Sequence, residues 1–187
     1  CGTEYLQTVI EAMQKSKELQ IDYQQFYGHR ETFNIQPYAM KVYHQRWYIV
    51  GYLKEQKAIR NISLDRTLSM EITTEMFQYP KDFNAEEYYY NTVGIFINEK
   101  LKPQKIVIRA YGIHVEYMRT LPLHHTQEEV QCKNQQYSDF QYYLCVTPEL
   151  INQLLSMGEK IEVLEPVELR KEIKTRLLNS LNHYNYE

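Results

Sequence analysis

Four short apolar and aromatic runs lie between residues 19 and 66, separated by segments of hairpin length: YGHRE, HQ and KEQK. Turns this short make consecutive strands pair in the antiparallel direction. We therefore predict a small antiparallel β-barrel, the architecture into which such strands close most easily. Pro37, inside the second run, indicates a strand that bends or lies on an edge there. One helical turn is expected in DRTLS, residues 65–69, before a last strand at residues 70–73.

The segments on either side of this barrel have helical patterns. Between residues 4 and 18, four apolar side chains recur at steps of three and four, which predicts an amphipathic helix: Leu6, Val9, Ile10 and Met13. The chain begins Cys-Gly-Thr, without Met, so we expect residues 1–18 to be a linker helix that follows a preceding domain. We assign residues 19–77 to the barrel and residues 78–104 to a linker with one short helix.

Residues 105–187 predict a second domain with the order β-α-β-β-α-β, which is typical of a ferredoxin-like fold. The helix at residues 147–158 has all its terminal signals: Thr147 as N-cap, Pro148 at the first helical position, and Gly158 at the end. A closing helix follows, with Leu169, Ile173 and Leu177 on one face. The fold class is therefore α+β.

Charge is distributed unevenly along the chain, whose net charge is -3. Residues 19–70 contain seven Lys or Arg and four Asp or Glu, so this segment carries +3 and the rest -6. A local excess of positive charge favours an anionic partner. The 18 tyrosines suit surfaces that both stack and form hydrogen bonds, although tyrosine also simply favours strands.

The three cysteines, Cys1, Cys132 and Cys145, form neither a CxxC pair nor a zinc spacing, which suits a reducing cytoplasm. No apolar run is long enough to cross a bilayer, and no signal peptide is visible. The residues His124 and His125 are not expected to share a metal, and no phosphate-binding glycine loop is present. We expect no cofactor, no metal and no catalysis.

Arginines interrupt the predicted strands of the barrel. Arg60 is in phase with Ala58, Ile62 and Leu64, and a cation held against apolar surface is costly unless it is paired. One possibility is that Arg60 reaches solvent or pairs with Asp22 or Asp65. The other is that Arg46, Arg60 and Arg66, with His44, converge on an external anion. The planar fork of arginine suits phosphate, and Tyr23, Trp47 and Tyr48 could offer stacking or hydroxyl contacts.

The same stretch resembles the WYL domain, an Sm-like β-barrel. The residues that carry the resemblance are Pro37-Tyr38, Trp47-Tyr48-Ile49, Gly51-Tyr52, Arg60 and Leu64-Asp65-Arg66. Residues 105–187 are similar to the WCX extension that accompanies this domain in bacterial regulators. The matching segments include KIVIRAYG, RTLPLHHTQEE and TPELINQLLSMGEKIEVLEP.

The resemblance implies a part of a bacterial transcriptional regulator, commonly a homodimer, whose winged helix-turn-helix reads operator DNA and is absent from this chain. It also implies a barrel that senses single-stranded DNA or a nucleotide-like ligand. By position, the ligand-binding residues would be Tyr23, His44, Arg46, Trp47, Tyr48, Arg60 and Arg66. Two alternatives stay open: a structural dimerisation module whose arginines pair internally, and an enzyme acting on nucleotides.

Overall fold

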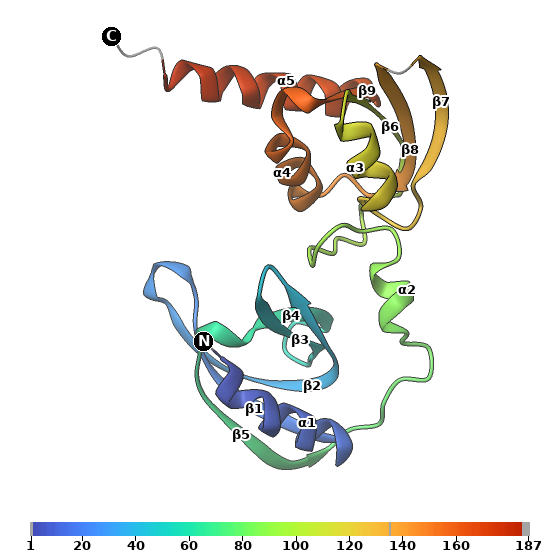
Figure 1. The fold of residues 1–187 in the computed structure, drawn as a ribbon. Coiled ribbons are helices and arrows are strands. Elements are labelled where there is room, and N and C mark those ends of the chain that lie inside the picture. Colours follow the sequence, from blue (N-terminus) through green and yellow to red (C-terminus); the bar gives the residue numbers. More distant parts are fainter. Residues whose placement is uncertain (1, 135, 185–187) are drawn as a thin grey trace. The chain divides into compact units, whose positions relative to one another are not determined.

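The computed structural model describes residues 2–134 and 136–184, without the side chains of residues 131–134. The chain divides into two compact units, Cys1–Tyr88 (unit 1) and Tyr89–Glu187 (unit 2). Each unit contains one antiparallel sheet with helices against it (Figure 1). The predicted α+β class is therefore confirmed.

The sheet of unit 1 has five strands in the order β4-β3-β2-β1-β5. Their bounds are β1 Lys17–Gln24, β2 Arg30–Tyr43, β3 Arg46–Leu53, β4 Ala58–Ser63 and β5 Thr67–Met76. The predicted hairpins β1–β2, β2–β3 and β3–β4 are all present. In the described part of the chain no pairing joins β4 to β5, so the sheet is open and the predicted closure into a barrel is not observed.

The N-terminal helix is shorter than the sequence pattern suggested. A 3-10 turn, η1 (Thr3–Tyr5), leads into α1 (Leu6–Gln14), and β1 begins at Lys17. Ser16 adopts a left-handed φ of 51°, which stops the helix. Helix α1 lies against β1, β2 and β5 and buries Val9 and Ala12, whereas Ile10 is 41% exposed.

The core of unit 1 lies between α1 and the inner face of the sheet. Its buried strand residues alternate as a half-buried sheet requires: Leu19, Ile21 and Tyr23, then Phe33 and Ile35, then Ile49 and Leu53. Trp47 packs against this core, on the same face of β3 as Ile49. Gly51 lets the β2 backbone approach, since a Cβ there would lie 2.4 Å from the carbonyl oxygen of Gln36.

Pro37 marks a change in the pairing of β2. The β1–β2 pairing ends at Ile35, and a bulge separates Pro37 from Ala39 in the pairing with β3. The predicted bend at this proline is confirmed. Beyond it, Tyr38 packs against the rings of Phe77, Tyr79 and Phe83, with centroid distances of 5.8, 5.4 and 5.2 Å.

Unit 2 has the predicted element order. After the short helix α2 (Ala85–Tyr89) come β6 Gln104–Tyr111, α3 His114–Thr120, β7 Glu128–Asn134, β8 Tyr137–Leu144, α4 Pro148–Ser156, η4 Gly158–Lys160, β9 Ile161–Glu165 and α5 Val167–Asn182. The sheet order is β7-β8-β6-β9, so the first and third strands of this series lie at its centre. Side chains of α3, α4 and α5 share one core with β6, β8 and β9, including Met118, Leu154 and Leu169 (Figure 1).

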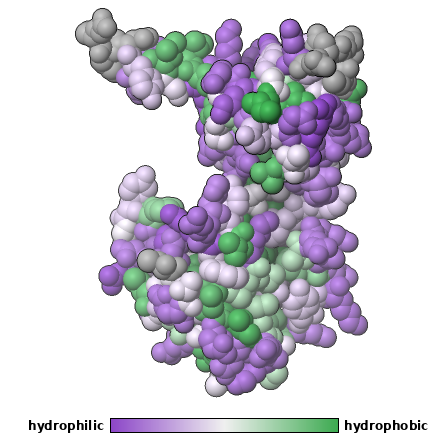
Figure 2. Space-filling model, viewed as in Figure 1, coloured by the Kyte–Doolittle hydropathy of each residue, from purple (hydrophilic) through white to green (hydrophobic). Residues whose placement is uncertain are grey.

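Helix α5 is only partly packed. Leu169 is buried and Ile173 packs on the core, but Leu177, Leu178 and Leu181 are about half exposed. Figure 2 shows hydrophobic surface along this outer half of the helix. The three leucines also line a cleft of about 350 Å³ beside α4 and β9.

No helix within residues 2–134 and 136–184 is both long and apolar enough to span a membrane. The thiol of Cys145 is free and half-buried, and its burial raises its pKa. Cys1 and the side chain of Cys132 lie outside the described part, so their predicted state stays a prediction.

The N-cap of α4 provides a test of the fold of unit 2. Thr147 is buried, and its hydroxyl accepts a hydrogen bond from the Leu150 amide at 3.2 Å, as predicted. Thr147→Val keeps the shape but leaves that amide unsatisfied, so we expect the free energy of unfolding to fall by about 1–2 kcal/mol. Thr147→Ser, which retains the hydroxyl, should lose less. Urea unfolding followed by circular dichroism measures both, and a valine variant as stable as wild type would contradict the cap.

Candidate nucleic-acid interface

One arginine of unit 1 lies between two aromatic rings. Arg66 ends η3 (Leu64–Arg66), and Tyr23 lies near the end of β1. The antiparallel pairing of β1 with β5 sets Tyr23 opposite Thr67, next to Arg66. The guanidinium carbon of Arg66 is 5.0 Å from the centroid of the Tyr23 ring and 4.4 Å from that of the Phe26 ring. Both distances fall in the range of cation–π contacts.

The donors of Arg66 remain open. Its Nε is buried and has no hydrogen-bond partner in the described part of the chain, where the guanidinium also forms no ion pair. A buried donor without a partner is costly, and an arginine carries five N–H donors in a planar fork. The guanidinium is thus held by contacts with two rings, and its buried Nε has no partner within the described part of the chain.

Arg46 reaches the same segment from β3. Its Nη1 lies 3.5 Å from Oδ2 of Asp65, the residue before Arg66. Asp65 also accepts a hydrogen bond from the Ser63 hydroxyl. About half of the Arg46 side chain is exposed, so this ion pair contributes little to stability. Arg46 thus pairs with the residue that precedes Arg66 in the chain, and η3 carries one acid beside these two cations of the sequence.

The other aromatic candidates are mainly core residues. Tyr23 and Tyr48 are buried, and Trp47 packs on the core. Burial raises the pKa of the Tyr23 hydroxyl, while the nearby Arg66 acts in the opposite direction. Tyr23 therefore supports Arg66 with its ring and offers no open stacking face. His44 belongs to the β2–β3 turn, where its ring lies 4.1 Å from that of Tyr43.

The structure does not bring Arg60 to Arg46 and Arg66 as the sequence suggested. Arg60 is exposed, and its guanidinium donates to Gln56 Oε1 at 2.8 Å and to the Ile59 carbonyl at 3.0 Å, at the β3–β4 turn. Asp22 instead accepts hydrogen bonds from Thr32 and Ser69, which lower its pKa. Strand alternation placed Arg60 on the same face as Ile62 and Leu64. Ile62 and Leu64 are buried, whereas Arg60 is exposed.

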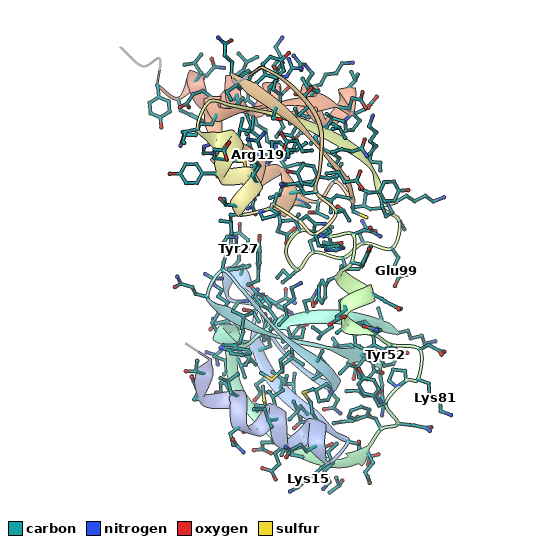
Figure 3. All side chains as sticks on the ribbon, turned by 45° about the vertical axis from the view of Figure 1, so that its right-hand side comes forward. Lys15, Tyr27, Tyr52, Lys81, Glu99 and Arg119 are labelled. Atoms are coloured by element: carbon teal, nitrogen blue, oxygen red, sulfur yellow. The ribbon has the colours of Figure 1, made fainter. Side chains whose placement is uncertain are left out.

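Phe26 and Tyr27 were missed because the segment YGHRE was interpreted only as a turn. Phe26 lies in η2 (Phe26–Gly28), the link between β1 and β2, and covers Arg66. Tyr27 is fully exposed and projects from the same hairpin (Figure 3). The signal was present in the sequence: two adjacent aromatics followed closely by His29 and Arg30. Among the described side chains there is no group of three or more His, Cys, Asp or Glu that could bind a metal.

The two contrasting arginines give a stability test. We expect Arg66→Ala to lower the free energy of unfolding by about 1–2 kcal/mol, because it removes two cation–π contacts, one beside a buried ring. Arg60→Ala is the matched control and should change it by less than about 0.5 kcal/mol. The only tryptophan, Trp47, lies in unit 1, so its fluorescence in urea reports this unit. Equal effects of the two substitutions would contradict the described packing of Arg66.

Comparison with known proteins identifies both units. The family model of the WYL domain matches residues 4–72, and that of the WCX domain matches residues 102–181. No curated protein matches the chain.

Two solved structures are similar. Proteasome accessory factor B/C (PafBC) of Arthrobacter aurescens is 21% identical with a TM-score of 0.44, over 99% of this chain and 28% of that chain. A CRISPR Cas-related protein is 12% identical with a TM-score of 0.55, over 95% of this chain and 50% of that chain. The chain thus spans half or less of either protein, and only the second likeness supports a common fold. Together, the two family matches show that the chain belongs to the proteins in which a WYL domain is followed by a WCX domain.

Proposed function

We propose that this chain is the ligand-sensing and dimerising part of a bacterial transcriptional regulator that works in the cytoplasm. In this proposal unit 1 binds single-stranded DNA or a nucleotide-like anion. We call the proposed site the basic-aromatic surface: Arg46, Arg66 and Phe26, with the buried Tyr23 supporting Arg66. The observation that carries the proposal is the guanidinium of Arg66, held between two rings with a buried donor that has no partner.

The chemistry of this surface suits a phosphodiester. A guanidinium edge can donate two parallel hydrogen bonds to phosphate oxygens, and Arg46 adds a second cation beside it. Aromatic side chains next to such cations are typical of proteins that bind single strands, whose bases are free to stack. Arg60 lies at another turn, so we propose that it is not a main phosphate contact.

A ligand at Arg66 would act directly on the N-terminal segment. Turn η1 contacts η3, the turn that carries Arg66, and the Tyr5 hydroxyl donates to the Leu68 carbonyl at 2.9 Å. Gly2 lies so close to η3 that a Cβ would be 2.5 Å from the Leu64 carbonyl carbon. A ligand that binds one position of η3 better than another would therefore shift α1. Operator DNA would be read by a helix-turn-helix outside this chain.

We also propose a more specific fold for each unit. The meander of β1 to β4, followed by a helical turn and by β5 returning to β1, supports an Sm-like, partly open barrel for unit 1. The interleaved order β7-β8-β6-β9 supports a ferredoxin-like fold for unit 2. We also propose that the chain binds its ligand without catalysing a reaction. Turnover of a nucleotide by the purified protein would contradict this.

Fluorescence anisotropy with short single-stranded DNA at increasing salt tests the proposal. Each phosphate contact should add roughly 0.7 to the slope of log affinity against log salt. We expect Arg66→Gln to weaken binding and to reduce this slope by roughly 0.7, the contribution of one phosphate contact, because it removes the charge while keeping a polar side chain. Arg60→Gln is the matched control and should leave both unchanged. Asp65→Asn, which frees Arg46, should strengthen binding.

The results separate three outcomes. Loss of binding in Arg66→Gln alone supports the basic-aromatic surface. An equal loss of binding in Arg60→Gln would support the broader site that the sequence suggested, with Arg60 as a further contact. Absence of binding by the folded wild-type protein would refute the nucleic-acid function and leave a structural module.

The exposed half of α5 favours the alternative of a dimerisation module. Leu177, Leu178 and Leu181 present apolar surface beside the cleft that they line, so one helix can fill the cleft of a second copy. We expect Leu178→Lys to raise the dimer dissociation constant at least tenfold, measured by analytical ultracentrifugation. Val167→Lys, at a similarly exposed position outside the cleft lining, is the control. A dimer unaffected by Leu178→Lys would place the interface elsewhere.

A further inference from the structure

The β1–β2 hairpin carries two consecutive aromatic side chains in solvent. Phe26 is 66% exposed even though one side of its ring lies over Arg66, and Tyr27 is fully exposed. We call these two residues the aromatic tip. Single exposed apolar residues are ordinary, but two adjacent large rings at the end of a hairpin form a surface that suits a flat ligand.

The backbone of the hairpin holds the aromatic tip in one conformation. The Gln25 amide donates to the His29 carbonyl at 2.7 Å, and the Gly28 amide donates to the Gln25 carbonyl at 3.2 Å. The Gln25 side chain adds a hydrogen bond to Glu31 Oε1 at 2.7 Å. Tyr27 itself has a φ of 69°, a conformation that bulky residues rarely adopt. The hairpin therefore presents the tyrosine outward in a conformation that has an energetic cost.

The aromatic tip has two arginines near it. Arg30 follows it closely and is exposed, and Arg66 lies directly beneath Phe26. The carboxylate of Glu31 is bonded to Gln25. A flat apolar surface bordered by cations is complementary to a nucleotide, which combines a base with a phosphate.

We infer that the aromatic tip stacks unpaired nucleobases while Arg66 contacts the adjoining phosphate, so that the ligand is single-stranded nucleic acid of at least two nucleotides. This inference rests on the proposed function and deepens it. The bases of a duplex are paired and stacked and cannot reach Tyr27, and inorganic phosphate or polyphosphate offers no base. The aromatic tip thus selects single strands over duplexes and over simple anions.

The test uses the whole chain and fluorescein-labelled oligothymidylate of about twelve nucleotides, within the range of single-strand site sizes. A strand of equal length with abasic sites presents the same phosphates without bases. We expect Tyr27→Ala to weaken oligothymidylate binding about tenfold, the loss of one stacked base. The salt slope should stay unchanged, because no phosphate contact is lost. The abasic strand should bind wild type and Tyr27→Ala equally.

Two further variants control this experiment. Tyr27→Trp keeps a flat ring and should retain binding. Tyr143→Ala removes another exposed tyrosine, on β8 of unit 2, and should have no effect. Tyr27 is fully exposed, so unfolding followed by Trp47 fluorescence should match wild type.

The outcomes distinguish this inference from the function on which it rests. If Tyr27→Ala binds like wild type while Arg66→Gln loses binding, stacking at the aromatic tip is refuted and the proposed function stands. If wild type binds the abasic strand as tightly as oligothymidylate, stacking is likewise refuted. If wild type binds none of these strands, both fail.

Discussion

The double pairing of β1 is the constraint on which unit 1 depends. On one side β1 pairs with β2, its neighbour in the chain, and on the other with β5, which begins more than forty residues later. Such a distant pairing closes a long loop and so costs conformational entropy that the contacts it makes must offset. It sets Tyr23 beside Arg66 and Asp22 beside Ser69, and α1 then covers the resulting sheet.

The same pairing explains why Arg66 differs from the other arginines. Arg109, Arg119, Arg170 and Arg176 form ion pairs with acids, and Arg60 has neutral hydrogen-bond partners. Arg66 instead packs against two rings, which hold the cation without satisfying its donors. Contacts with aromatic rings do not use the N–H donors of an arginine. That is the physical basis for proposing a ligand contact at this residue.

Local patterns in the sequence predicted much of the fold. Alternation and turn length gave the four hairpin strands, and Thr147 and Pro148 correctly marked the start of α4, because these signals act over a few residues. One expectation failed: helix α1 ends at Gln14, because Ser16 turns the chain with a positive φ. For Arg60, the structure agrees with the alternative in which its side chain reaches solvent. Of the residues proposed from the sequence, Tyr23 and Arg66 are in contact, whereas the contact of Phe26 with Arg66 was not foreseen.

By itself, the sequence determined the family, the order of helices and strands in the two units, and the presence of cations among aromatic strands. Each of these follows from the spacing of residues that are close together in the chain. Only the tertiary structure decided which aromatic rings contact which cation. The contact of Arg66 with Tyr23 depends on the β1–β5 pairing, and its contact with Phe26 depends on the path of the hairpin turn. Neither can be deduced from strand alternation, which gives the face of a residue but not its partner across the sheet.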